Sequence, residues 1–257
     1  VGQSGGPTAA INASLAGVYR TAKDRGAKKV YGMLHGIQGL LKEKYIDLSD
    51  HIKTELDAEL LKRTPAAFLG SCRYKLPEIH ENREVYDKIF EILDKLDIEA
   101  FIYIGGNDSM DTIKKLSDYA IVFGHAIRFI GCPKTIDNDL WGTDMTFGFQ
   151  SAVDIATDTI DRIHTTATSH SRVFIVEVMG HKVGWVTLHA GIAGGADIIL
   201  LPEIPYDVDN VVRAIKSRTE AGKHFTIIAV AEGAITKEDA APVSYTHLRA
   251  HETRRHL

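Results

Sequence analysis

Cysteine is scarce in this sequence, with only Cys72 and Cys132 among 257 residues. Two thiols without a neighbouring cysteine or a metal-type spacing argue against a disulfide scaffold and indicate a reduced, cytoplasmic protein. Long apolar runs are also missing: without a stretch of about 18 apolar residues or a basic-then-apolar leader, we expect neither a transmembrane helix nor a signal peptide. A basic excess is missing too, because the formal net charge is −4. Nucleic acid and anionic membrane surfaces are therefore not expected partners, and a bound anion needs a local cluster of donors.

The remaining composition is ordinary for a globular protein with a large core, at 44% apolar and 25% charged residues. Apolar β-type runs alternate with amphipathic segments, which predicts α/β architecture with parallel sheets and right-handed crossovers. We expect two domains, 1–147 and 148–241. The expected strands are the end of a first strand at 1–2, then 29–33, 98–104, 126–131, 172–179, 198–201 and 225–231, the last two buried. The expected helices are 8–18, 49–62 with Leu56, Leu60 and Leu61 facing inward, 81–96, 109–119, 147–169, 183–193 and 210–221, and a turn is expected at 36–40.

Two polar segments follow apolar runs. The first, 103–111, contains Gly105-Gly106-Asn107-Asp108-Ser109 at the start of a helix, so backbone N–H groups and a positive dipole end point toward any anion there. The second, 133–139, has Lys134 beside Asp137 and Asp139. In an extended loop the two aspartates point the same way, one able to act as a base and the other to organise a metal or its water. Both segments are expected at the carboxyl edge of one sheet, where ligands of α/β proteins bind; the alternative is plain strand-to-helix turns.

A further glycine-rich turn, 2–7, runs directly into the helix expected at 8–18. It lacks the Lys-Ser/Thr of a P-loop and the third glycine of the dinucleotide fingerprint, so a phosphate loop and a tight turn both stay open. Arg73, in the loop 70–74, is a solvated surface charge unless that loop folds toward the glycine turns.

The character of the chain changes at residue 242. The segment 242–257 has three His, three Arg and one Glu and no usable apolar period. His247, His251 and His256 form a conceivable metal tract. We interpret the segment instead as a non-native tail, fused where the true chain was cut.

Taken in order, the polar motifs resemble those of the phosphofructokinases, and within them the pyrophosphate-dependent type. The resemblance covers residues 1 to about 240 and implies two Rossmann-like, three-layer αβα domains with mostly parallel sheets. The motifs are Ser4-Gly5-Gly6, Gly70-Ser71-Cys72-Arg73, Gly105-Gly106-Asn107-Asp108-Ser109, Pro133-Lys134-Thr135-Ile136-Asp137-Asn138-Asp139, Val176-Glu177-Val178-Met179-Gly180 and Glu232-Gly233.

The resemblance implies a reaction. A Mg²⁺-dependent enzyme of glycolysis and gluconeogenesis would make fructose 1,6-bisphosphate from fructose 6-phosphate, with pyrophosphate (or ATP) as donor, as a homodimer or homotetramer. Phosphoryl transfer needs positioned positive charge, a metal and a base on the attacking hydroxyl, which such motifs can supply. The first domain would bind the donor and the second fructose 6-phosphate.

The resemblance also implies roles for single residues. Asp137 matches the base for the sugar 1-hydroxyl, Thr135 contacts the transferring phosphoryl group, and Asp139 is an acidic partner near magnesium. Donor-binding positions are Gly5, Gly6, Arg73, Gly106, Asn107, Asp108, Ser109 and Lys134, with Asn107 and Asp108 as metal positions. Sugar-binding positions are Thr135, Asp137, Met179, Gly180, Glu232 and Arg172, the last reaching a neighbouring subunit.

Two positions favour pyrophosphate. ATP-using relatives have glycines where Asp108 and Lys134 stand, and a carboxylate at 108 would repel the α-phosphate of ATP while Lys134 can pair with compact pyrophosphate. Two others depart from the family: Asn107 stands where the metal-binding aspartate is usual, and His181 where an arginine is common. The family's C-terminal portion is also missing, so we expect low activity or stability. ATP-dependent phosphofructokinase and a non-catalytic sugar-phosphate-binding module remain the alternatives.

Overall fold

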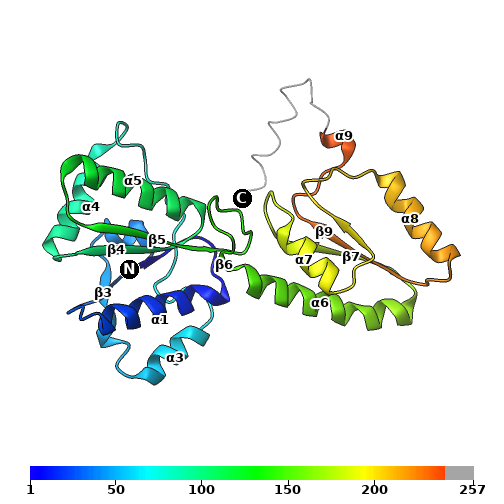
Figure 1. Cartoon of the computed structure of the whole chain (residues 1–257), viewed down its shortest axis with the longest axis horizontal. Coiled ribbons are helices and arrows are strands. Elements are labelled where there is room, and N and C mark those ends of the chain that lie inside the picture. Colours follow the sequence, from blue (N-terminus) through cyan, green and yellow to red (C-terminus); the bar gives the residue numbers. More distant parts are fainter. Residues whose placement is uncertain (241–257) are drawn as a thin grey trace. The chain divides into compact units, whose positions relative to one another are not determined.

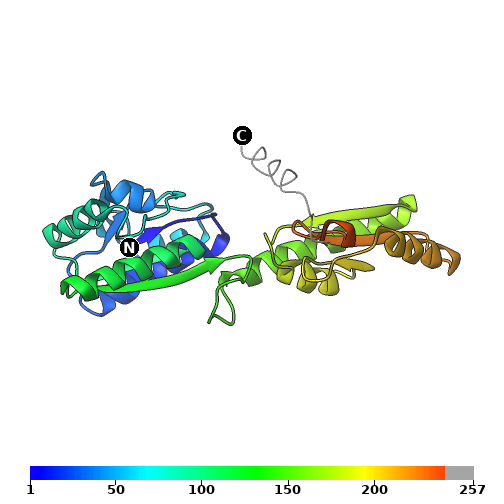
Figure 2. The same cartoon turned by 90° about the horizontal axis from the view of Figure 1, so that it is seen from above.

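A computed structural model of the chain describes residues 1–240. The fold is mixed α/β with mostly parallel sheets, which confirms the expected fold class. The chain divides into two compact units, Val1–Ser151 and Ala152–Leu257 (Figures 1 and 2). The segment interpreted as a non-native tail, with its three histidines, lies outside the described residues. No helix within residues 1–240 is long and apolar enough to cross a membrane.

The first unit is built on a six-stranded sheet with the order β3-β2-β1-β4-β5-β6. All neighbours are parallel except β2 and β3, which are antiparallel. The strands are β1 (Gly2–Gln3), β2 (Tyr31–Met33), β3 (Tyr45–Asp47), β4 (Ala100–Gly105), β5 (Arg128–Thr135) and β6 (Phe147–Gly148). The helices are α1 (Ala9–Asp24), α2 (Gly36–Leu40), the 3₁₀ helix η1 (Leu48–Asp50), α3 (Glu55–Arg63), α4 (Arg83–Lys95) and α5 (Asn107–Phe123).

Two apolar cores lie on opposite faces of this sheet. Helices α4 and α5 cover one face, where the Phe90 ring contacts Tyr119 and Phe129. Helices α1 and α3 cover the other, where Ile11 and Leu61 are buried (Figure 1). Fully burying a side chain of this size contributes roughly 1.5–3 kcal/mol. The sheet is thus a rigid middle layer, and its strand ends hold the loops that follow them in fixed places.

Two expectations for this unit were wrong. The expected helix 49–62 is a 3₁₀ turn followed by α3, because Thr54 and Asp57 form a capping box that starts the helix at Glu55. In this register Ala58 and Leu61 face inward, while Leu56 and Leu60 are 66% and 57% exposed. The turn expected at 36–40 is the short helix α2.

The second unit contains a parallel sheet with the order β7-β9-β8. Its strands are β7 (Val173–Val178), β8 (Ile198–Leu200) and β9 (Thr226–Ala231), and its helices are α6 (Phe149–His170, which starts in the first unit), α7 (Trp185–Ala193), α8 (Val208–Glu220) and α9 (Lys237–Ala240). Helices α6 and α7 pack on this sheet through Ile160, Ala190 and Ile227. β9 is buried as expected, whereas β8 is only partly buried.

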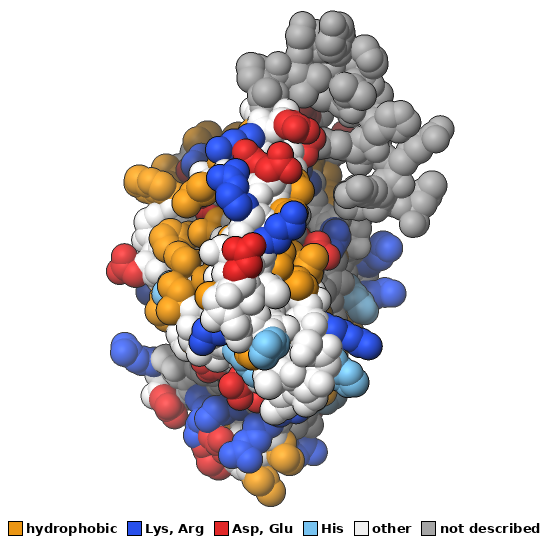
Figure 3. Space-filling model, turned by 90° about the vertical axis from the view of Figure 1, so that its right-hand side faces the viewer, with side chains coloured by type: hydrophobic (Ala, Val, Ile, Leu, Met, Phe, Trp, Pro, Cys, Tyr) orange, Lys and Arg blue, Asp and Glu red, His pale blue; other side chains and the backbone are white. Residues whose placement is uncertain are grey.

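Hydrophobic side chains also reach the surface of the second unit. The outward positions of β7 include Ile175, which is 69% exposed. Apolar side chains lie in patches among charged ones on the face drawn in Figure 3.

Candidate active site

The carboxyl ends of β1, β4 and β5 meet at one point of the first sheet. Gln3 pairs with Ile104, and Gly105 pairs with Pro133. From β1 the chain moves outward to β2, whereas from β4 it moves in the other direction to β5, so the order reverses between β1 and β4. Such a switch point is where open α/β sheets bind ligands. The motifs at 4–6, 105–109 and 133–139 all lie here, and the sequence predicted this edge for the last two.

We call the loop after β1, from Ser4 to Thr8, the donor loop. Hydrogen bonds to several other segments hold it in place. Ser4 N donates to Ile104 O (2.9 Å) and Ser4 Oγ to Cys72 O (3.0 Å). Gly5 adopts φ +77°, a conformation that favours glycine. Its carbonyl accepts from Ser71 Oγ (2.5 Å), and the Gly6 carbonyl accepts from Lys134 Nζ. The donor loop is thus held from three other segments: β4, residues 71–72 and β5.

Two helices begin beside each other at this point. Thr8 precedes α1 and Gly106 precedes α5. Within residues 1–240, no side chain caps the start of either helix. A Cβ added to Gly5 would lie 3.7 Å from Gly106 N, and one added to Gly105 would lie 2.9 Å from Ser4 O. The glycines therefore let two helix N-termini approach closely. Uncapped N–H groups and two positive dipole ends make this a favourable place for a phosphate.

Lys134 is buried, with 3% of its surface exposed. The expected strand 126–131 in fact runs from Arg128 to Thr135, so Lys134 belongs to β5 and not to the following loop. Burial lowers the pKa of Lys134, and the negative charge of Asp137 acts in the opposite direction. A Cβ added to Gly5 would lie 3.7 Å from Lys134 Nζ. The lysine is therefore a compact cation directly beneath the donor loop.

The aspartate segment after β5 turns sharply. Asn138 lies in the left-handed region at φ 56°, and its Oδ1 accepts from Thr146 N (2.8 Å). Thr146 Oγ1 in turn donates to Thr135 O (2.8 Å), and Asp137 N donates to Thr135 Oγ1 (3.1 Å). The expectation of an extended loop was wrong at Asn138, because asparagine tolerates the left-handed turn that these bonds fix.

Asp139 instead faces the start of α5. Asn107 Nδ2 donates to Asp139 Oδ2 (2.8 Å). The other oxygen, Asp139 Oδ1, is buried and has no hydrogen-bond partner within residues 1–240. Asp108 is exposed in the first turn of α5. The described residues contain no group of three or more His, Cys, Asp or Glu side chains able to hold a metal. Mg²⁺ often uses one or two carboxylates and completes its shell with water and phosphate oxygens, so Asp139 fits such an ion only together with a phosphate ligand.

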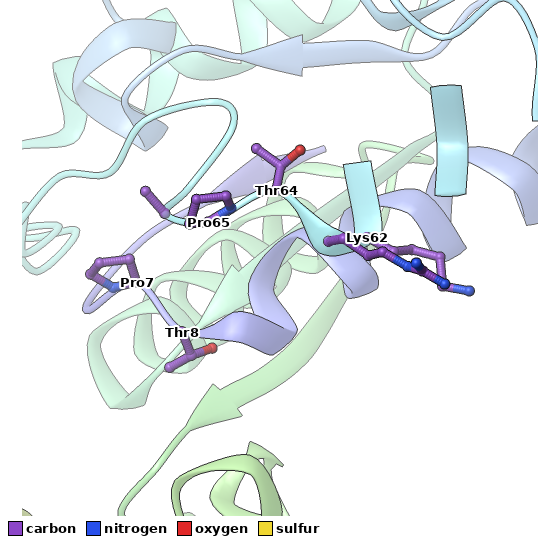
Figure 4. A pocket seen from close by; sticks show the side chains of 7 residues that line it. Pro7, Thr8, Lys62, Thr64 and Pro65 are labelled. Carbon is purple, nitrogen blue, oxygen red and sulfur yellow. The ribbon is translucent and has the colours of Figure 1, made fainter. Parts of the chain in front are cut away.

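The segment carrying Arg73 folds onto the donor loop. Buried Asn12 donates to Thr64 O (2.8 Å) and Ala66 O (2.7 Å) and accepts from Phe68 N (2.9 Å) and Gln3 Nε2 (2.9 Å). Next to Arg73, Ser71 Oγ donates to Gly5 O (2.5 Å) and Cys72 O accepts from Ser4 Oγ (3.0 Å). This meets the condition under which Arg73 is of interest, although its side chain is exposed. A hollow of about 390 Å³ lies beside the donor loop (Figure 4); it is lined by Pro7, Thr8, Lys62, Arg63, Thr64, Pro65 and Ala66.

The second unit gathers its own polar residues at the carboxyl ends of β7 and β9. Val178 pairs with Ala231, so the segments that follow these residues are neighbours. The Glu232 carboxylate accepts from His181 N and from Gly180 N (3.3 Å). Met179 is exposed beside them. Arg172 precedes β7 and is therefore at the other end of the strand, about 20 Å of extended chain away.

We predicted no role from the sequence for several residues that shape these sites. Ser71 and Asn12 act through contacts with distant segments, whereas Asn138 and Thr146 bond to each other, 8 positions apart. Ser71, for example, is 66 positions from Gly5. A recognisable signal existed only for Asn138, because asparagine favours such turns.

Comparison with known proteins decides the family. The model of the family described as phosphofructokinase matches residues 1–256. The chain belongs to the phosphofructokinase family. An ATP-dependent 6-phosphofructokinase of Spirochaeta thermophila is 42% identical over 245 residues, covering 92% of this chain and 64% of the relative. One from Corynebacterium efficiens is 43% identical over 235 residues, covering 91% and 64%.

Solved structures similar to this chain include members of the same family whose names give pyrophosphate as the donor. A pyrophosphate-dependent phosphofructokinase from Nitrosospira multiformis has a TM-score of 0.83 and 34% identity, covering 92% of this chain and 60% of that one. One from Marinobacter aquaeolei has a TM-score of 0.79 and 38% identity, covering 91% and 60%. This chain thus spans under two thirds of the length of these relatives.

Proposed function

We propose that this chain belongs to a Mg²⁺-dependent 6-phosphofructokinase that transfers a phosphoryl group from pyrophosphate to fructose 6-phosphate. One observation carries the choice of donor. At the meeting point of two uncapped helix N-termini, Gly5 lies against both Gly106 N and the ammonium of Lys134, each 3.7 Å from where its Cβ would be. A compact polyanion such as pyrophosphate suits a point where two helix N-termini and a lysine ammonium converge.

Asp108 supports the same donor. It is exposed in the first turn of α5, two residues after Gly106, so a longer polyphosphate chain that continued along this helix start would approach its carboxylate. A carboxylate there repels further phosphate charge, whereas pyrophosphate ends before it. Gly6, Ser109 and Arg73 complete the donor-binding set in this proposal.

The proposed chemistry uses the turn after β5. Asp137 takes the proton from the sugar 1-hydroxyl, and the oxygen then attacks the terminal phosphorus of the donor as the bridging P–O bond breaks and inorganic phosphate leaves. Thr135, which fixes the Asp137 backbone through its Oγ1, contacts the transferring group. Asp139, with the Asn107 amide oxygen and the donor's phosphate oxygens, would hold Mg²⁺, which neutralises developing charge when bound.

The second unit supplies the proposed sugar-phosphate site. The Glu232 bonds fix the backbone at Gly180 and His181 with Met179 beside them. Arg172 lies at the opposite strand end and would serve the site of a neighbouring subunit, which makes a homodimer or homotetramer part of the proposal.

ATP is the second candidate donor, because the two curated relatives quoted above carry ATP-dependent names. A phosphorus NMR assay separates the donors directly. Fructose 6-phosphate, Mg²⁺ and either donor are incubated with the chain, alone and extended by the C-terminal part of a relative. We expect fructose 1,6-bisphosphate and phosphate with pyrophosphate, and none after Asp137→Asn. Product with ATP alone would contradict pyrophosphate as the donor. If neither the chain nor its extended form gave product with either donor, the proposed catalytic activity would be refuted.

A further inference from the structure

We infer that Ser71 is a positioning residue that sets the donor loop in its phosphate-binding conformation before any donor arrives. This inference rests on the proposed function of the same site and adds a residue to it. Ser71 is not a ligand in this account. Its hydroxyl proton is used to hold the Gly5 carbonyl at 2.5 Å.

The direction of that bond determines where the loop's N–H groups point. In a trans peptide the carbonyl of one residue and the N–H of the next point in opposite directions. Holding the Gly5 carbonyl toward Ser71 therefore turns the Gly6 N–H away from Ser71. The Gly6 carbonyl is held in its turn by Lys134 Nζ, and the next peptide has no N–H because residue 7 is proline. We call the two bonds to the Gly5 and Gly6 carbonyls the clamp. From Gly6 to Pro7, the Gly6 N–H is thus the one backbone donor that the clamp can orient.

The clamp has a clear energetic reason. Two consecutive glycines have the widest backbone freedom of any pair, and ordering them costs more entropy than ordering other residues. A loop fixed before binding does not lose that entropy when the donor binds. Without the clamp, the donor would have to order Gly5 and Gly6 itself.

Ser71 is itself held in place. Leu69 N donates to Gln3 Oε1 (2.9 Å), and Cys72 O accepts from Ser4 Oγ (3.0 Å) and Gly5 N (3.5 Å). The backbone on both sides of Ser71 is therefore bonded to β1 and the start of the donor loop. Ser71 is consequently held beside Gly5, where its hydroxyl donates to the Gly5 carbonyl.

Calorimetric titration of pyrophosphate with Mg²⁺ into the full chain tests this inference. Ser71→Ala should raise the dissociation constant about tenfold, the equivalent of one hydrogen bond of ordinary net strength. Ser71→Thr and Ser71→Val are nearly equal in shape and differ in the hydroxyl. Thr should bind within about twofold of the parent, and Val as weakly as Ala. A purely structural loss would not be rescued by Thr alone.

Two controls complete the test. Ser49→Ala removes a buried hydroxyl of the same unit that has no hydrogen-bond partner within residues 1–240, and it should leave pyrophosphate binding unchanged. Fructose 6-phosphate binding should be unchanged in every variant, because within the described part of the chain neither Ser71 nor Ser49 bonds to a residue proposed to contact the sugar. Equal pyrophosphate affinity of Ser71→Val and Ser71→Thr would overturn the inference. If the parent bound neither pyrophosphate nor ATP, the proposed function would fail first and the inference with it.

Discussion

Replacing Asn12 by alanine should be among the most destabilising single changes in the first unit. Asn12 is fully buried, and its amide is used completely: Nδ2 makes two bonds and Oδ1 accepts two. These bonds join β1 and α1 to the segment 64–68, which leads to Ser71. Alanine removes all of them and leaves their partners facing a cavity.

The magnitude follows from the number of bonds. Four bonds at about 1 kcal/mol each give a loss of about 4 kcal/mol in the free energy of unfolding. Unsatisfied partners increase this loss, and water entering the cavity reduces it. For a unit of about this size, such a change lowers Tm by about 10 °C.

Urea unfolding followed by circular dichroism measures the loss. Asn82→Ala is the matched control, because Asn82 precedes α4 without a side-chain capping bond in the described structure. Its effect should stay within about 0.5 kcal/mol. If Asn12→Ala cost no more than Asn82→Ala, the account of a fully used amide joining three segments would be refuted.

Three further predictions concern Lys134, Gly105 and Glu232. Burial lowers the pKa of Lys134 below its ordinary 10.5. At pH values between the folded-state and unfolded-state pKa, the unfolded chain therefore binds more protons than the folded chain. The stability of the parent relative to Lys134→Met should therefore rise with pH through that window and stay level below it; a fall in urea titrations would contradict this. Gly105→Ala places a Cβ 2.9 Å from the Ser4 carbonyl and should lower stability by about 1–3 kcal/mol in thermal unfolding. Gly17→Ala, with open space around it, should not. Glu232→Ala leaves two N–H groups without their acceptor and should weaken fructose 6-phosphate binding about tenfold in calorimetry, whereas Glu238→Ala on α9 should leave it unchanged.

The alternation of strands and helices could be predicted because it depends on local periodicity. The β4–α5–β5 order and the polar motifs at its strand ends were evident in the sequence and are present in the structure. Helix α3 was predicted in the wrong register, although Thr54 and Asp57 carry a capping signal that places its start. The prediction followed the stripe of leucines instead of that signal. With the helix starting at Glu55, Leu56 is exposed.

The details of the site could not be predicted in the same way. The clamp on the donor loop joins Gly5 to a residue 66 positions away and Gly6 to one 128 positions away. No local pattern carries such pairings, because the sheet order brings the segments together. The pairing of Asn107 with Asp139 is equally distant, at 32 positions. The site roles given to these residues by family resemblance remain predictions.

A comparison of pyrophosphate and ATP binding to the parent chain tests this account most directly. Both are titrated with Mg²⁺ into the parent and into the double variant Asp108→Gly, Lys134→Gly. The account predicts that the parent binds pyrophosphate more tightly than ATP and that the double variant loses this preference. Tighter binding of ATP by the parent, or a preference that survives the double substitution, would contradict it.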